Sequence, residues 1–155
     1  MSNTLYTHVD VEIARPPLAV WNVITNYATD TSWRKGITAM TPDRPGPPEV
    51  GTNVHEVLRL GGREYITDTS ITKVGPGLTY SFAGIGTSGV VRGRRSVVTA
   101  DKPDSAVFSY DVELEPVNIP RPVRPILRRW LQHSLQRDVH RLRNMLERTP
   151  TPSAT

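Results

Sequence analysis

The 155-residue chain contains no cysteine. Without thiols it can form no disulfide, no thiolate metal site and no cysteine nucleophile. It also lacks an apolar run approaching the roughly 20 residues of a membrane-spanning helix. Residues 1–5 have neither the charged nor the apolar region of a signal peptide. These absences predict a cytoplasmic protein.

The signatures of several common enzyme classes are missing as well. No Gly-x-Ser-x-Gly elbow and no cluster of Ser, His and Asp is present, so serine-hydrolase chemistry is unsupported. His133 and His140 are seven residues apart on one expected helix. That separation is about 10 Å by helical rise, too far for both to bind one metal ion. We therefore expect no metal and no cofactor.

One motif matches a nucleotide-binding pattern in its letters. Residues 84–89 read Gly-Ile-Gly-Thr-Ser-Gly, a G-x-G-x-x-G sequence. A dinucleotide-binding fingerprint requires a helix after the third glycine, whereas Val90 begins a segment typical of a strand. We interpret the motif as a glycine-rich hairpin loop.

The overall composition is that of an ordinary globular protein, with 37% hydrophobic and 22% charged residues. A chain of this length forms one domain that is large enough to bury a core. We expect this domain to cover residues 1–148. Residues 149–155 are rich in Pro, Ser and Thr, and we expect a disordered tail there.

The longest regular stretch is residues 121–148. It contains no Gly or Pro from Ile126 onward, and its leucines recur at helical spacing, which predicts a long amphipathic helix. Eight arginines against two acidic residues give it a charge of +6, while the whole chain carries +4. The ordinary interpretation is a solvated outer face whose arginine stems cover apolar surface, which argues against a nucleic-acid partner. The other interpretation is a contact with nucleic acid or a transient contact with a membrane surface.

The first half of the chain predicts a strand followed by two short helices. Apolar and polar residues alternate over residues 5–14, as in a half-buried strand. Prolines then lead into an expected helix over residues 18–26, and Thr29 or Asp30 is expected to cap a further turn ending at Trp33.

Charge pairing indicates how the next strands pair. A Gly61-Gly62 turn would place Leu60 opposite Arg63 and would set Arg59 against Glu64 and His55 against Asp68. In the last hairpin, pairing Val97 with Phe108 would set Arg94 against Asp111 and Arg92 against Glu113. For residues 78–83 the register stays open. A four-residue connection before them would turn Tyr80 and Phe82 inward beside Ile71.

These registers place two charged residues, Glu56 and Arg95, on the inner face of the sheet. Charges are seldom buried without a partner. One interpretation is that the two pair with each other or lie at a wet rim. The other is that they orient a polar group of a ligand, with tyrosine hydroxyls nearby. Burial in an apolar pocket tends to raise the pKa of a carboxyl group, which makes Glu56 the acid or base candidate. Arg95 would anchor an anion or a carbonyl group.

Several local motifs occur along the chain. They are Pro-Pro-Leu-Ala-Val-Trp at 16–21, Trp33 after an acidic turn, Val-Gly-Thr at 50–52, and Gly-Pro-Gly-Leu-Thr-Tyr-Ser-Phe at 75–82, followed by the long last helix. Together they resemble the START-like, or SRPBCC, superfamily, and more narrowly its polyketide cyclase/dehydrase-like branch. The resemblance covers about residues 5–148 and implies that residues 1–148 form a START-like ligand-binding domain.

The resemblance implies an α+β helix-grip fold. In this fold a curved antiparallel sheet, here of about six to seven strands, wraps around the C-terminal helix and leaves an apolar cavity between sheet and helix. Two short helices follow the first strand. Members of the superfamily include lipid carriers, hormone receptors and aromatase/cyclases.

Our leading hypothesis is a protein that binds a hydrophobic small molecule, such as a lipid, a polyketide or an aromatic compound, between the sheet and the last helix. The candidate ligand-binding residues are Trp33, Glu56, Leu58, Tyr65, Tyr80, Phe82, Arg95, Phe108, Tyr110, Leu127, Leu131 and Leu135. The alternative is a cyclase or dehydratase in which Glu56 acts as acid or base and Arg95 anchors a carbonyl group. The sequence gives no indication of the oligomeric state.

Overall fold

Seven strands form one antiparallel sheet in the order β1-β7-β6-β5-β4-β3-β2. A computed structural model describes residues 4–117 and 119–149. The strands are β1 (Leu5–Ile13), β2 (Ile37–Pro42), β3 (Asn53–Leu60), β4 (Arg63–Val74), β5 (Leu78–Gly86), β6 (Gly89–Thr99) and β7 (Ala106–Pro116). The helices are α1 (Pro17–Ile24), α2 (Asp30–Trp33) and α3 (Arg124–Arg148), with short 3-10 turns at Tyr27–Thr29 and Arg121–Val123.

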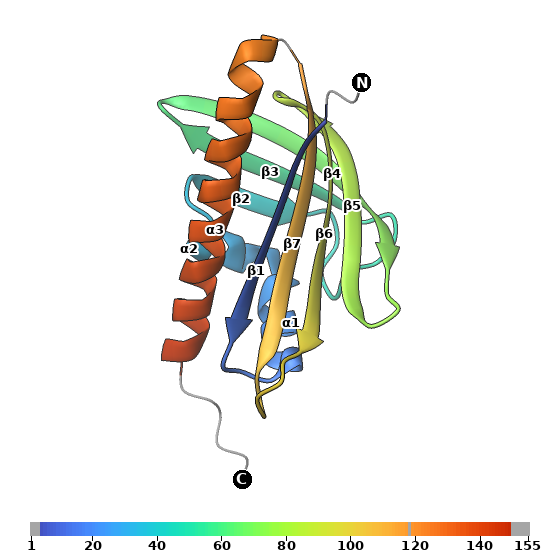
Figure 1. Cartoon of the computed structure of the whole chain (residues 1–155). Helices are drawn as coiled ribbons and strands as arrows, with labels where there is room; N and C mark the ends of the chain where they lie inside the picture. Colours follow the sequence, from blue (N-terminus) through green and yellow to red (C-terminus); the bar gives the residue numbers. More distant parts are fainter. Residues whose placement is uncertain (1–3, 118, 150–155) are drawn as a thin grey trace.

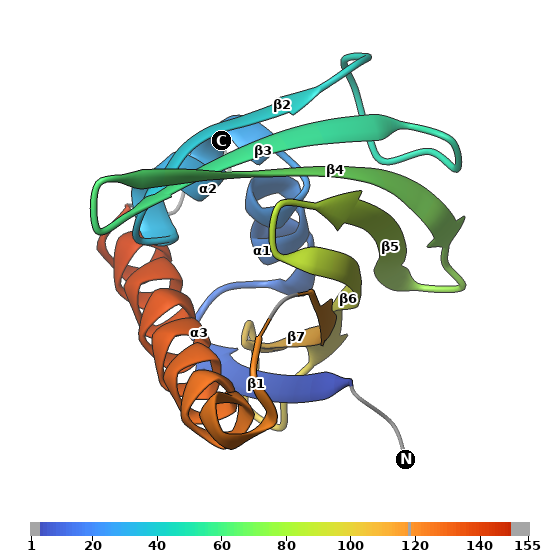
Figure 2. The same ribbon diagram turned by 90° about the horizontal axis from the view of Figure 1, so that it is seen from above.

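The sheet is strongly curved, and α3 lies along its open side (Figure 1). Seen from above, the strands bend from β2 around to β1, while α1 and α2 lie toward one end of the space they enclose (Figure 2). The expected α+β helix-grip fold, with two short helices after the first strand, is therefore confirmed. The end of the expected tail, residues 150–155, lies outside the described residues.

Helix α3 is attached to the sheet through the free edge of β1. Every second residue of β1 from Leu5 to Ile13 is buried, as the alternating pattern predicted. Gln132 of α3 donates from Nε2 to the carbonyl oxygen of His8 at 2.8 Å, and its Oε1 accepts the His8 backbone N–H at 3.3 Å. Side chains of α3 thus satisfy backbone groups that an edge strand would otherwise expose.

The strand registers inferred from charge pairing are confirmed. Leu60 lies opposite Arg63 in the β3–β4 pair, and Val97 lies opposite Phe108 in the β6–β7 pair. Tyr80 is buried on the inner face, as expected. The expected connection was one residue too long, because three residues, 75–77, separate β4 from β5. A β-bulge between Ile71 and Lys73 changes the register of this pair, so that Ile71 still lies opposite Phe82.

Proline begins α1 as expected, but the second short helix is not capped as predicted. Pro17 occupies the first turn of α1, where its missing N–H costs nothing. Neither Thr29 nor Asp30 makes a side-chain cap hydrogen bond to α2. The Asp30 carboxylate instead turns into the protein interior, where it pairs with arginine side chains.

The hydrophobic core fills only part of the space between the sheet and α3. Its main cluster joins β1, β6 and β7 to α1 and to the C-terminal half of α3, with Phe108, Val139 and Leu142 fully buried. The N-terminal half of α3 is much more open, since Ile126 is 69% exposed and Trp130 is 42% exposed. The space beside this open half contains the candidate site.

Candidate ligand-binding site

A chamber of about 160 Å³ lies between the inner face of the sheet and α3. It is lined by Tyr27, Arg34, Met40, Val54, Glu56, Leu58, Thr67, Thr69, Tyr80, Phe82, Val91, Arg95, Tyr110, Val112, Leu114, Leu131 and Leu135. Most of these side chains are aliphatic or aromatic, and the few charged ones gather around α2. This combination of an apolar wall with a small number of polar groups is typical of small-molecule sites.

The structure brings eight of the twelve candidate residues together around the chamber. They are Glu56, Leu58, Tyr80, Phe82, Arg95, Tyr110, Leu131 and Leu135. Trp33 and Phe108 are fully buried and pack edge-to-face with ring centroids 6.1 Å apart, so they support the chamber from behind. Tyr65 and Leu127 are half-buried and do not line it.

Arg95 forms a buried ion pair with Asp30 at one end of the chamber. Its Nη2 donates to Asp30 Oδ2 at 2.5 Å and its Nη1 donates to Asp30 Oδ1 at 3.2 Å, in a bidentate arrangement. The guanidinium group also lies 5.0 Å from the ring centroid of Trp33 and 4.6 Å from that of Tyr110. Both the expected pairing with Glu56 and the alternative of a wet rim are therefore wrong for Arg95, which is almost completely buried.

Glu56 pairs with a different arginine. Arg34 donates from Nη2 to Glu56 Oε1 at 3.1 Å and from Nη1 to Asp30 Oδ2 at 3.3 Å. The order Arg95, Asp30, Arg34, Glu56 thus alternates in sign and carries no net charge. Two donors remain, because the Nε–H groups of Arg34 and Arg95 are buried without an acceptor among the described residues.

The pKa shifts of this network follow from its burial. Burial alone lowers the pKa of Arg95, but the adjacent Asp30 carboxylate, together with Tyr80 and Tyr110, outweighs this effect and keeps the pKa well above its ordinary value. Burial raises the pKa of Tyr80 well above its ordinary value, although Arg95 acts against this shift. Arg95 therefore stays charged, and the Tyr80 hydroxyl stays a neutral hydrogen-bonding group.

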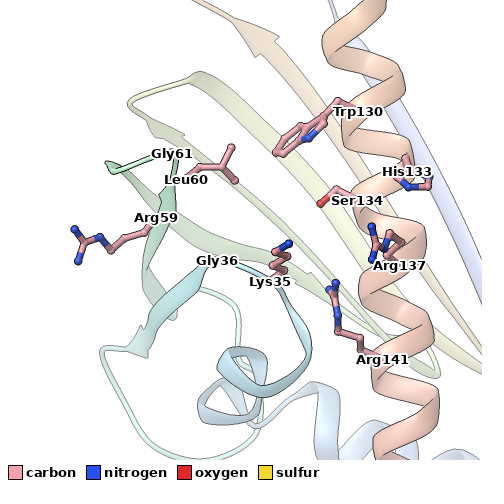
Figure 3. A pocket seen from close by; sticks show the side chains of 10 residues that line it. All are labelled: Lys35, Gly36, Arg59, Leu60, Gly61, Trp130, His133, Ser134, Arg137 and Arg141. Atoms are coloured by element: carbon pink, nitrogen blue, oxygen red, sulfur yellow. The ribbon is translucent and has the colours of Figure 1, made fainter.

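A second, more open space is bounded by the same two elements, β3 and α3. This groove, of about 460 Å³, is lined by Lys35, Gly36, Arg59, Leu60, Gly61, Trp130, His133, Ser134, Arg137 and Arg141 (Figure 3). Helix α3 presents Leu131 and Leu135 to the chamber and Trp130 and Ser134 to the groove. The ordinary interpretation placed the arginines of α3 on a solvated outer face. Arg137 and Arg141 instead line this groove.

Within residues 4–117 and 119–149, no group of three or more His, Asp or Glu side chains is placed to hold a metal ion. Helices long and apolar enough to cross a bilayer are also absent from this part of the chain.

A family sequence model described as "Polyketide cyclase / dehydrase and lipid transport" matches residues 6–147. The chain belongs to this family. The match confirms the resemblance seen in the sequence motifs. Together with the fold, membership favours either binding of a hydrophobic ligand or activity of the cyclase type.

Solved structures agree on the fold. A START superfamily protein from Mycobacterium smegmatis has a TM-score of 0.75 at 15% identity, over 92% of this chain and 97% of its own. The protein TTHA0849 from Thermus thermophilus has a TM-score of 0.77 at 12% identity, with the same coverage. Ara h 8.0201 has a TM-score of 0.60 at 13% identity, over 90% of this chain and 98% of its own. No curated protein matches the chain in sequence.

Sequence reasoning missed Asp30 and Arg34 as site residues. Asp30 was interpreted as a helix cap, although an inward arginine on β6 requires a carboxylate and the strands offered only Glu56. The need of Arg95 for a second carboxylate was the signal in the sequence that could have pointed to Asp30. Lys35, Arg137 and Arg141 were missed because the sequence alone does not show which part of α3 lies beside the turn between α2 and β2.

Proposed function

We propose that this protein binds a hydrophobic small molecule in the chamber between the sheet and α3, and acts as a carrier or binding protein rather than as an enzyme. The observation that carries the proposal is the chamber itself. Its walls come from the inward face of the sheet and from Leu131 and Leu135 of α3, at the margin of the main hydrophobic core.

The volume limits what the chamber can hold. A dry cavity of about 150 Å³ accepts a molecule the size of benzene. The chamber, at about 160 Å³, therefore suits one aromatic ring or a short length of acyl chain. The rest of a larger ligand would extend along β3 and α3 toward the groove of about 460 Å³.

The charged network sets the polar chemistry at the inner end. Because Arg95, Asp30, Arg34 and Glu56 balance one another, this end offers no excess charge to an ionic ligand. The two free Nε–H donors suit a neutral acceptor such as a carbonyl or hydroxyl oxygen. We therefore expect a mostly apolar ligand whose inner end carries at most a neutral oxygen.

The cyclase or dehydratase alternative has support from the position of Glu56 and three tyrosines on the chamber wall. Both of its proposed catalytic groups, however, are engaged by protein partners, Arg95 by Asp30 and Glu56 by Arg34. Turnover of a test polyketide distinguishes the enzyme from the carrier. Activity that is lost in the Glu56→Gln variant but kept in the neighbouring control variant Thr67→Val would favour the enzyme.

Fluorescence of N-phenyl-1-naphthylamine, an uncharged probe, tests the binding proposal directly. We expect the probe to bind with enhanced emission and to be displaced by long-chain alcohols. Native mass spectrometry of the purified protein, with organic extraction of its contents, would identify a co-purified ligand. A protein that binds neither the probe nor any extractable apolar molecule would contradict the proposal.

A further inference from the structure

The groove beside the open half of α3 gathers positive charge. In Figure 3, Lys35 reaches in from the turn between α2 and β2, and Arg137 and Arg141 reach in from α3, while Arg59 extends away from the helix. The side chains of Lys35 and Arg137 make no ion pair with any described residue, and Arg141 pairs only with Asp138. Three cations therefore face one groove, and a single buried carboxylate pairs with one of them.

Asp138 holds the Arg141 side chain and the backbone of Lys35. It is buried, and its Oδ1 accepts from Arg141 Nη1 at 2.6 Å and from the backbone N–H of Lys35 at 3.2 Å. The bond to Lys35 ties α3 to the turn before β2, whereas the bond to Arg141 lies within α3. The fold thus fixes the Arg141 guanidinium group and the backbone position from which Lys35 extends.

The turn that carries Lys35 is also closely fitted to the sheet. Gly36 has a positive φ of 88°, and a Cβ there would lie 2.8 Å from the carbonyl oxygen of Arg59. Only glycine allows this approach, which places Lys35 next to β3 and opposite α3. The groove is therefore bounded by fixed backbone on both sides.

Two exposed apolar side chains also line the groove. Trp130 and Leu60 face each other across it and are 42% and 37% exposed (Figure 3). Trp130, Ser134, Arg137 and Arg141 follow one face of α3 at spacings of four, three and four residues. This face lies beside the one that carries Leu131 and Leu135, so apolar and cationic surfaces meet along the same helix.

We propose that this groove binds the anionic group, a carboxylate or a phosphate, of the same ligand whose apolar part occupies the chamber. The inference rests on the proposed function and narrows the ligand to an amphipathic anion. The distribution of charge supports this proposal. The network of Arg95, Asp30, Arg34 and Glu56 in the chamber carries no net charge, whereas the groove has an excess of cations. Arg137 and Arg141 offer donors to the oxygens of such a group, and the Ser134 hydroxyl adds a neutral one.

Three probes that share a ten-carbon chain test the inference: decanoate, decyl phosphate and decan-1-ol. Each is used below its micelle-forming concentration, and its binding is measured by displacement of N-phenyl-1-naphthylamine. The informative variant is Lys35→Gln combined with Arg137→Gln. The matched control is Arg129→Gln combined with Arg148→Gln, which removes the same charge from exposed positions of α3 outside the groove.

We expect the groove variant to weaken binding of decanoate or decyl phosphate by about tenfold, since each exposed ion pair contributes up to about fivefold. Decan-1-ol should bind the variant and the wild type equally well, and the control variant should bind all three probes like the wild type. Raising the salt concentration should weaken binding of the anions alone. A larger loss for decyl phosphate would identify phosphate as the preferred group, and a larger loss for decanoate would identify a carboxylate.

Two outcomes would overturn the inference, and they differ from failure of the proposed function. Anion binding that is unchanged in the groove variant, or that falls equally in the control variant, would exclude the anion site. If decan-1-ol still binds in that case, the proposed binding of an apolar ligand in the chamber is not contradicted. Failure of the wild type to bind decan-1-ol and the fluorescent probe would exclude the chamber, and with it the anion site.

Discussion

The two halves of α3 face different surroundings. In the C-terminal half, Val139, Leu142 and Leu146 are all buried against the sheet and α1. In the N-terminal half, the apolar residues Ile126 and Trp130 remain exposed. One amphipathic helix therefore holds the domain together at one end and borders a ligand site at the other. The apolar stripe of α3 extends beyond the residues that pack in the hydrophobic core.

The difference shows how a small domain combines stability with an unfilled interior. Filling the whole space between sheet and helix would give more burial but no chamber. Here the core is concentrated in β1, β6, β7 and α1. The β3–β4 hairpin extends beyond the cover of α1 and α2, so that its inner face is only half-buried and borders the chamber. The predictions below test this division between a closed and an open half.

The largest effect is expected at the ion pair that joins the closed half to the chamber. Asp30→Asn should lower the free energy of unfolding by about 3–5 kcal/mol, because it leaves Arg95 charged and buried without its partner. Urea denaturation measures the change. The control is Glu56→Gln, the same substitution at the partly exposed end of the network, which should cost clearly less. Equal losses of unfolding free energy in the two variants would show that burial of the Arg95–Asp30 pair does not determine its contribution to stability.

Truncation of leucine in the closed half should have the next largest effect. Leu142→Ala should cost about 2–5 kcal/mol, since Leu142 is fully buried and the change leaves a cavity. Ile126→Ala, in the open half, should change stability by no more than about 0.5 kcal/mol. Thermal unfolding of both variants measures the contrast. Similar losses would mean that both halves of α3 carry the fold.

Filling the chamber should affect binding more than stability. Leu58→Trp places a larger side chain into the chamber and should weaken binding of N-phenyl-1-naphthylamine by about tenfold, or about 1.4 kcal/mol. Val57→Trp is the matched control, because Val57 lies on the opposite face of β3 and does not line the chamber. A probe that binds both variants like the wild type would place its site elsewhere.

The smallest effect is expected on the outer face of β1. Hydrogen bonds to Asp111 and Asp10 raise the pKa of His8 above its ordinary value of 6.5, despite an opposing effect of burial. Protonated His8 therefore stabilises the folded state below pH 6.5, and this contribution is lost as pH rises through the raised pKa. Because the side chain is 42% exposed, solvent screening limits the effect to a few tenths of a kcal/mol.

Melting temperatures of the wild type and His8→Gln, compared at about pH 6 and then at steps of rising pH, measure this contribution. The wild type should exceed the variant at the lowest pH and approach it as the pH rises. A difference that is independent of pH would show that the His8 contacts do not depend on its charge.

Local patterns in the sequence determined the elements and most of their pairing. Alternation in β1, the Gly61-Gly62 turn and the charge pairs in the hairpins were sufficient, because side-chain period and cross-strand charge act over short range and fix the register. The same registers correctly turned Glu56 and Arg95 inward. The β4–β5 connection was predicted less well, since a bulge changes the register without changing the hydrophobic pattern.

Only the tertiary structure decided the partners of the inward charges and the position of α3. Asp30 lies 65 residues before Arg95, and no local pattern links the two. The attachment of α3 to the edge of β1 leaves its N-terminal half beside the chamber and brings Lys35 together with Arg137 and Arg141 at the groove. These contacts depend on how distant elements pack in three dimensions, and the order of residues along the chain does not specify that packing locally.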